Sequence, residues 1–210
     1  MAKRRKKVTP LRRALRTTLP VVLWLIFAWW YTNTEGPLSA EEIERYLATL
    51  ESRGTDPERR ERMRGFLTND TGDDFVMLNL LELNKSSSVE NPHAEAEAAL
   101  DTYMEHMWPA LIRRGCHPVN LGTSAAAALE VWGIDGARNW SQGAMMRYRS
   151  RRDLVEIAMN EDFQGPHDAK FAALNKTIAV PLDPWVNSGD PRLLLGLIAL
   201  SATLIGLRRR

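Results

Sequence analysis

The sequence predicts an α+β domain held between two transmembrane helices, and three observations carry this prediction. All 26 acidic residues lie between Glu35 and Asp190, whereas a basic cluster and a charge-free apolar run stand at each end of the chain. Between these runs, extended apolar segments alternate with segments that repeat apolar residues at helical spacing. The single cysteine, Cys116, excludes an intrachain disulfide framework.

Residues 17–32 are predicted to form the first transmembrane helix, after a basic tail at residues 1–16. The run is short, because a hydrocarbon core about 30 Å thick requires roughly 20 apolar helical residues. Its aromatic residues suit the membrane interface, and they make Trp24, Trp29 and Trp30 the predicted anchor residues. A cleaved signal peptide is the alternative, but bulky aromatic residues stand where a cleavage site needs small ones.

The second transmembrane helix is predicted at residues 193–207, after a linker at 183–192 and before a basic tail at 208–210. A helix of this length is about 22 Å long, so the flanking arginines, among them Arg192, must snorkel toward the interface. Gly196 and Gly206 supply small surfaces on which another helix can pack. An ordinary tail anchor with small residues placed by chance is the alternative.

The charge distribution predicts location and partners. Positively charged flanks are retained on the cytoplasmic side, so we expect both termini in the cytoplasm and the acidic domain across the membrane. A bacterial inner membrane with the central domain in the periplasm fits this pattern, and the lipid bilayer is then an obligatory partner. The arginines of residues 57–67 alternate with acids, as on a solvated helix face, so no nucleic-acid partner is expected.

Residues 33–73 are predicted to form a charged helical stalk. Ser39-Ala-Glu-Glu42 is a capping box that opens one helix. Asp56 followed by Pro57 is an N-cap with proline at the first helical position, which opens a second helix.

Residues 74–182 are predicted to form a ferredoxin-like βαββαβ sandwich, in which helices cover one face of an antiparallel sheet. A strand at 75–83 precedes a long helix at 94–115 that Pro109 should kink or divide. Short extended runs follow at 117–121, 127–132 and 143–149. A helical region at 151–175, interrupted at 165–166, precedes a last strand at 177–180.

One face of such a sheet lacks a cover. Pairing two sheets face to face would bury it, so a homodimer through the sheet is expected.

Three blocks carry a resemblance to a known family. They are Val76-Met-Leu-Asn-Leu-Leu-Glu-Leu83, Trp140-Ser-Gln-Gly-Ala-Met-Met-Arg-Tyr-Arg-Ser150 and Asp162-Phe-Gln-Gly-Pro-His167. With these blocks, residues 74–182 resemble the dimeric α/β-barrel proteins of the unknown-function family thirteen-thirty. The resemblance implies a homodimer with a barrel-like interior, similar to antibiotic-synthesis monooxygenases and chlorite-dismutase-like haem proteins, but it does not imply their activity. The chain departs from the family at Arg149, where the family has proline, and at Ser141, where an acid is frequent.

The candidate site residues are few. His167 falls at the family-like histidine position and is the catalytic candidate, as a general base or ligand, with structural capping as the alternative. The residues predicted to line a ligand pocket are Asn79, Trp132, Trp140, Arg147 and Tyr148. A buried arginine there would suit a carboxylate. The alternative is that the apolar members are core and the arginines are solvated or paired with Glu130.

The sequence supports two functional hypotheses. Common nucleotide-binding and hydrolase motifs are absent, no ligand spacing indicates a metal, and no cofactor is expected. The first hypothesis is an accessory or scaffolding subunit that docks on a larger membrane complex through its helices and its extracytoplasmic domain. The alternative is a small-molecule-binding protein or an enzyme, monooxygenase-like or haem-protein-like, on the α/β-barrel scaffold. Whether there is catalysis stays open.

Overall fold

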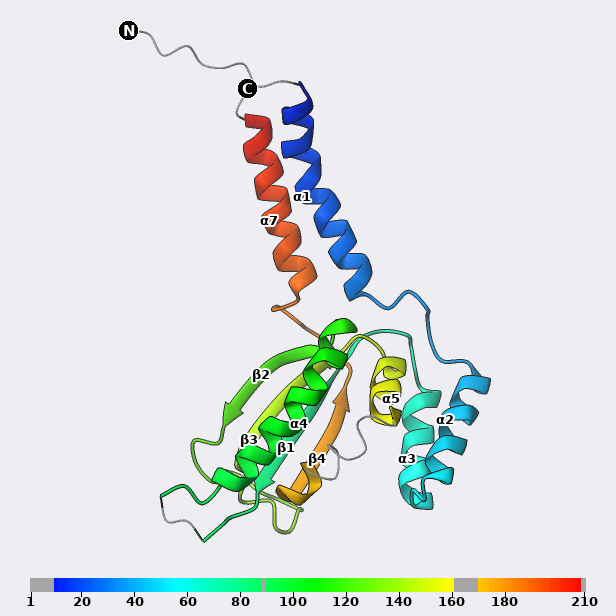
Figure 1. Ribbon diagram of the computed structural model, residues 1–210, viewed down its shortest axis with the longest axis vertical. Coiled ribbons are helices and arrows are strands. Elements are labelled where there is room, and N and C mark those ends of the chain that lie inside the picture. Colours follow the sequence, from blue (N-terminus) through cyan, green and yellow to red (C-terminus); the bar gives the residue numbers. More distant parts are fainter. Residues whose placement is uncertain (1–9, 88–89, 161–169, 209–210) are drawn as a thin grey trace. The chain divides into compact units, whose positions relative to one another are not determined.

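The chain forms two compact units. The computed structural model describes residues 10–87, 90–160 and 170–208, with side chains from residue 14 onward. One unit comprises Met1–Thr32 and Trp185–Arg210, and the other comprises Asn33–Pro184. The first unit contains two helices, α1 (Pro10–Tyr31) and α7 (Pro191–Arg208), which lie side by side (Figure 1).

Small residues of α7 face α1. The Trp24 indole Nε1 donates to the Arg192 carbonyl at 2.8 Å. A Cβ atom on Gly196 would lie only 3.0 Å from that indole, and one on Gly206 would lie 3.3 Å from the Thr17 methyl group. The two helices therefore run antiparallel, and the small surface predicted on the second apolar run packs against the first.

Both helices are long and apolar enough to cross a membrane. Their 18-residue apolar windows, Ala14–Tyr31 and Pro191–Arg208, have mean hydropathies of 1.3 and 1.5. Within these windows only Tyr31 and Ala199 are buried, so most of the apolar surface faces outward. Such a surface is unfavourable in water, because apolar groups gain free energy only when they are removed from it.

The second unit is built on a four-stranded antiparallel sheet in the order β2-β3-β1-β4. Its strands are β1 (Phe75–Leu83), β2 (His117–Thr123), β3 (Gln142–Tyr148) and β4 (Leu174–Leu182). Helix α4 (Ala94–Arg113) connects β1 to β2, and α5 (Arg151–Met159) follows β3. This order and pairing are those of the predicted ferredoxin-like fold.

Helix α4 lies across one face of the sheet (Figure 1). Its buried residues Tyr103, Met107 and Leu111 form one core cluster with Met146 of β3. Pro109 was predicted to kink or divide this helix, but α4 is continuous through it. Buried side chains before and after the proline pack on the same sheet, and this packing holds the two halves together.

Two sequence predictions are wrong in this unit. Residues 127–132 form no strand but part of the β2–β3 loop, in which Leu129 is 100% and Trp132 91% exposed. The edge strand β2 already pairs with β3, and the loop turns at Gly133 and Gly136, both with positive φ, so the run is not extended. Strand β4 begins at Leu174, inside the predicted helical region, because it pairs with the end of β1 across a register shift.

The segment predicted as a stalk forms two helices, α2 (Ala40–Ser52) and α3 (Pro57–Thr68). Both predicted N-caps are present, including the capping box of Ser39. The helices do not stand apart from the sheet domain, because Ile43, Leu47 and Leu67 share a core cluster with Val155 of α5.

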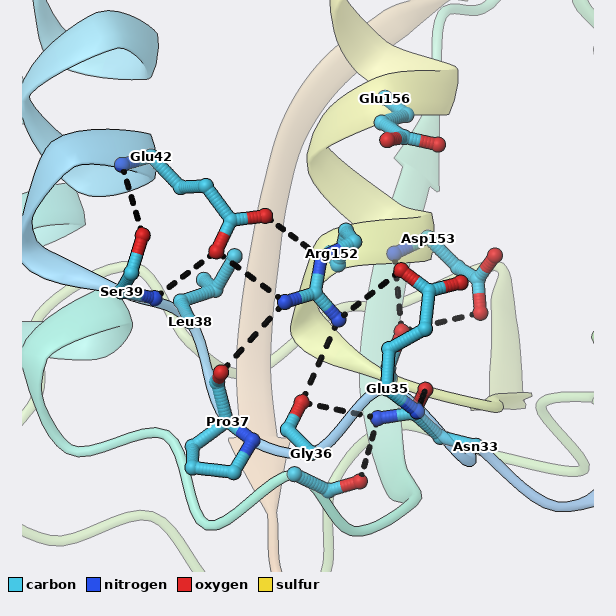
Figure 2. Close-up of polar contacts among 12 residues, drawn as sticks. Asn33, Glu35, Gly36, Pro37, Leu38, Ser39, Glu42, Arg152, Asp153 and Glu156 are labelled. Carbon is cyan, nitrogen blue, oxygen red and sulfur yellow. Dashed lines mark hydrogen bonds and ion pairs between the residues drawn. The ribbon is translucent and has the colours of Figure 1, made fainter.

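An arginine of α5 also holds the chain that leads into α2 (Figure 2). Arg152 donates through Nε to Glu42 Oε1 at 2.9 Å and through its other nitrogens to the carbonyls of Gly36 and Pro37. The Glu42 carboxylate also accepts the Ser39 amide at 2.8 Å. Hydrogen bonds from Arg152, followed by the Ser39 amide, lower the pKa of Glu42 to about 2.

Candidate functional site

The sheet face beneath α4 carries the candidate site. Side chains alternate between the two faces of a strand. The register pairs Leu81 with Gln142, Asn79 with Ala144, and Phe75 with Tyr148, which places these residues on the face that α4 covers.

A cleft of about 300 Å³ lies between this face and α4. That volume is at the lower end of small-molecule sites in proteins. The lining residues are mostly apolar, with a few polar groups among them: Asn79, Leu81, Leu100, Asp101, Tyr103, Met104, Met107, Trp108, Leu111, Leu121, Gln142, Ala144, Met146, Tyr148 and Lys170.

Two of the predicted ligand residues, Asn79 and Tyr148, meet in this cleft. The Asn79 side-chain nitrogen donates to the carbonyls of Met77 and Ala144 at 3.1 and 3.4 Å, so the amide oxygen is left to accept from a ligand. The Tyr148 ring stacks on Phe75 with centroids 5.4 Å apart. The Tyr148 hydroxyl is protonated at neutral pH, as tyrosines ordinarily are, and burial raises its pKa further, so it can donate.

Lys170 brings a positive charge to the cleft. Its Nζ lies 5.6 Å from the centroid of the Tyr103 ring. Burial, followed by the charge of Arg59, lowers the pKa of Lys170. Asp101 lines the same cleft but is exposed, and it forms no ion pair with Lys170.

Lys170 and Gln142 were missed by sequence reasoning. A lone lysine just before a short alanine-leucine segment carries no signal of its own. Gln142 lies just before the predicted strand at 143–149, in a block that carried only the family resemblance.

Arg147 does not reach the cleft, although it was predicted among the ligand-binding residues. It follows the opposite alternation to Tyr148, and it is fully buried. Its Nε donates to the Asp74 carboxylate at 2.8 Å and its Nη1 to the Gly115 carbonyl at 2.7 Å. The predicted alternative made the arginines solvated or paired with Glu130, whereas Arg147 is buried and pairs with Asp74.

The remaining predicted residues lie elsewhere. Trp132 projects from the β2–β3 loop. Trp140 donates its indole N–H to the Ala137 carbonyl at 2.8 Å and stacks beneath the Lys176 ammonium, 4.6 Å from the ring centroid. His167 lies outside the described residues, so its role as catalytic candidate stays a prediction.

Trp140 borders a second, more polar hollow of about 300 Å³ at the end of the sheet. His93, Glu97 and Glu82 line it together with Lys85. His93 Nδ1 lies 3.1 Å from the Asn84 carbonyl oxygen, so this nitrogen donates to that carbonyl. Among the described residues, no group of three or more His, Cys, Asp or Glu side chains is placed to hold a metal ion.

Cys116 is not a nucleophile in this structure. Its side chain is fully buried, and burial raises the pKa of the thiol to about 11. The thiolate is the reactive form, so this cysteine is largely unreactive at neutral pH.

No family model matches the chain, and no curated protein matches it. The expected membership of the unknown-function family thirteen-thirty therefore stays a prediction. The ferredoxin-like fold itself follows from the strand order and pairing described above.

Several solved structures are similar to this chain. A protein of unknown function from Rhodopseudomonas palustris has 25% sequence identity and a TM-score of 0.49, over 63% of this chain and 97% of that one. SnoaB, a cofactor-independent oxygenase from Streptomyces nogalater, has 9% identity and a TM-score of 0.37, over 56% and 99%. A dimeric protein of unknown function and ferredoxin-like fold from Bacteroides fragilis has 12% identity and a TM-score of 0.34, over 53% and 96%.

Proposed function

We propose that the chain is a membrane-anchored protein whose α/β domain binds a small, largely apolar molecule in the cleft under α4. The observation that carries the proposal is the cleft itself. It combines apolar walls with a few polar residues that line the same space: Asn79, Asp101, Gln142, Tyr148 and Lys170. Small-molecule sites in proteins have this composition.

Filling the cleft tests the proposal. Ala144 lies on its floor, opposite Asn79, so Ala144→Phe should occupy the space, whereas Ala144→Ser should leave it open. A suitable neutral probe is 4-(trifluoromethyl)benzamide, followed by fluorine NMR on the full chain in mild detergent. We expect saturable binding to the wild type and to Ala144→Ser, and none to Ala144→Phe. Equal binding by all three proteins would place the probe elsewhere and refute the proposal.

The membrane anchor in this proposal is the α1–α7 pair. Besides the close approach at Gly196, the Thr203 hydroxyl donates to the Thr17 carbonyl at 3.1 Å, and Arg192 lies over the Tyr31 ring while it pairs with Asp190 at 2.6 Å. Interhelical hydrogen bonds and small residues are the usual contacts between helices in lipid. The two helices then cross a bacterial inner membrane, with both termini cytoplasmic and the domain periplasmic.

Topology is tested by reporter fusions at each terminus of the full chain. Alkaline phosphatase is active only outside the cytoplasm, and a fluorescent protein that folds only in the cytoplasm is the matched reporter. We expect cytoplasmic signals from both ends. A periplasmic signal at either end would refute the two-span arrangement.

An accessory subunit is the second candidate, and the outward apolar surface of the anchor favours it. Trp29 is 69% exposed and Ile198 63% exposed, so these faces are available to lipid or to helices of another membrane protein. Purification of the tagged chain from its native membrane in mild detergent, followed by mass spectrometry, separates the cases. Stoichiometric membrane partners would support the subunit, whereas a chain without partners would refute it.

A homodimer through the open sheet face accompanies either candidate. Leu78 and Leu80 of β1 pair with Val180 and Ile178 of β4 on the face opposite Asn79, and the two β4 residues are 39% and 37% exposed. A second copy would bury these side chains, which favours association. Ile178→Glu should then yield a monomer in size-exclusion chromatography with light scattering, and an unchanged mass would refute the dimer.

A further inference from the structure

The charge at the cleft identifies a class of ligand, and the inference rests on the proposed binding function. Lys170 is half-buried and lies among mostly apolar lining residues. It forms no ion pair with any acidic side chain in the described part of the chain, and its ammonium lies over the Tyr103 ring. Keeping a cation partly out of water without a counter-ion is costly. An anion that enters the cleft would supply the missing charge.

The other charged groups near the cleft leave this role to Lys170. Asp101 lines the cleft but is exposed and negative, and Arg59 of α3 acts on Lys170 through its charge without lining the cleft. The neighbouring arginines of the β3–α5 segment are already in ion pairs: Arg147 with Asp74, and Arg149 with Asp153 at 2.8 Å. Among the described lining residues, Lys170 is thus the only cation. An ammonium group is a compact charge with three donors, and it binds a carboxylate without requiring the fixed geometry of an arginine fork.

The residues that line the cleft determine which chemical groups the rest of the ligand can carry. Leu100, Met104 and Trp108 of α4 offer apolar surface and an aromatic ring. Across from them, the Asn79 oxygen can accept a hydrogen bond and the Tyr148 hydroxyl can donate one. A volume of about 300 Å³ admits a molecule of one ring or a short branched chain rather than a lipid.

We propose that the cleft binds a small organic acid with one carboxylate and an apolar, ring-sized body, and that Lys170 pairs with the carboxylate. The apolar body packs on Leu100, Met104 and Trp108. A hydroxyl or amide group on the body would be recognised by Asn79 and Tyr148.

The test compares two probes that differ only in charge, on the full chain in mild detergent. They are 4-(trifluoromethyl)benzoate and 4-(trifluoromethyl)benzamide, with binding followed by fluorine NMR and a detergent blank subtracted. Three variants serve: Lys170→Met, which keeps the apolar stem; Lys170→Arg, which keeps the charge; and Lys176→Met, a control whose ammonium pairs with Glu82 outside the cleft.

We expect the wild type to bind the benzoate more tightly than the benzamide. Lys170→Met should weaken benzoate binding about tenfold or more, the size of one lost charge-assisted contact, while benzamide binding changes by less than about twofold. Lys170→Arg and Lys176→Met should keep the preference for the benzoate. Retained benzamide binding also shows that the Lys170→Met cleft is folded.

Two results would overturn the inference, and they are distinguishable. If Lys170→Met binds both probes as the wild type does, the cleft is a binding site but the carboxylate is not recognised by Lys170. If the wild type binds neither probe saturably, the proposed function fails, and the ligand class fails with it.

Discussion

Replacing Glu42 by glutamine should destabilise the domain in a manner that depends on pH. Glu42 accepts from Arg152 at 2.9 and 3.2 Å and from the Ser39 amide. Its pKa falls from 4.5 to about 2, chiefly through the hydrogen bonds from Arg152. At about 1.4 kcal/mol per pKa unit, this difference sets a ceiling of about 3 kcal/mol. The Glu42 side chain is 24% exposed, and solvent screening reduces the expected effect to about 1–2 kcal/mol.

The direction of the Glu42 pKa shift determines how stability depends on pH. The pKa of Glu42 is lower in the folded chain than in the unfolded one, so the ionised carboxylate stabilises the fold above its unfolded value of 4.5. That stabilisation is lost as the pH falls from 4.5 toward 2. The difference in the free energy of unfolding between the wild type and Glu42→Gln should therefore reach its maximum at about pH 7 and fall to less than half of that at about pH 3.

Urea unfolding of the full chain in mild detergent, followed by circular dichroism at both pH values, measures this difference. Glu44→Gln is the matched control on the same helix, because Glu44 is 63% exposed and pairs with Arg64 at the surface. Its effect should stay below about 0.5 kcal/mol. The reasoning is refuted if the two variants have equal stability at neutral pH, or if the Glu42 effect persists unchanged in acid.

Three further predictions concern other parts of the chain. Gly196→Ile should speed amide hydrogen exchange in α7, because an added Cβ would lie 3.0 Å from an indole of α1, whereas Leu197→Ile on the exposed face should not. Cys116 should resist alkylation at about pH 8 until urea unfolds the domain, since its pKa is about 11; rapid labelling of the native chain would contradict the burial. Gly72→Ala should cost about 2 kcal/mol or more in urea unfolding, because φ is +83° and backbone atoms lie 2.7 Å from the new Cβ. Gly54→Ala, with φ +72° and open space, should cost only about 1 kcal/mol; equal costs would show that the close approach is absent.

Local patterns predicted the elements of this fold well. The capping box at Ser39 and the proline after Asp56 mark helix starts that depend only on neighbouring residues, and both are present. The order βαββαβ was likewise readable, because periodicity separates strands from long helices. Residues 127–132 were wrongly predicted as a strand. A strand needs a neighbouring strand to pair with, and the sequence alone does not show that β2 is an edge strand that pairs only with β3.

The candidate site was less predictable, because it depends on which charges are already paired. Arg147 and Tyr148 were both predicted to line the pocket, but strand alternation puts them on opposite faces of β3, and the sequence does not show which face α4 covers. The partner of Arg147, Asp74, lies far away in the sequence. Lys170 is a candidate ligand-binding residue only because tertiary packing places it over the Tyr103 ring in a mostly apolar cleft. The sequence alone does not show this placement.

The arginines that follow β3 position helices, and none of them lines the cleft. Arg149 pairs with Asp153 inside the first turn of α5, and Arg151 and Arg152 hold α3 and the entry to α2. Each of these arginines is committed to a carboxylate or a carbonyl, so none is available to a ligand without breaking a contact that positions a helix. Tyr148, the last residue of β3, lines the cleft instead. A ligand can therefore be recognised there without disturbing the ion pairs that hold α2 and α3, and ligand binding and the Glu42 substitution should have additive effects on the stability of the domain.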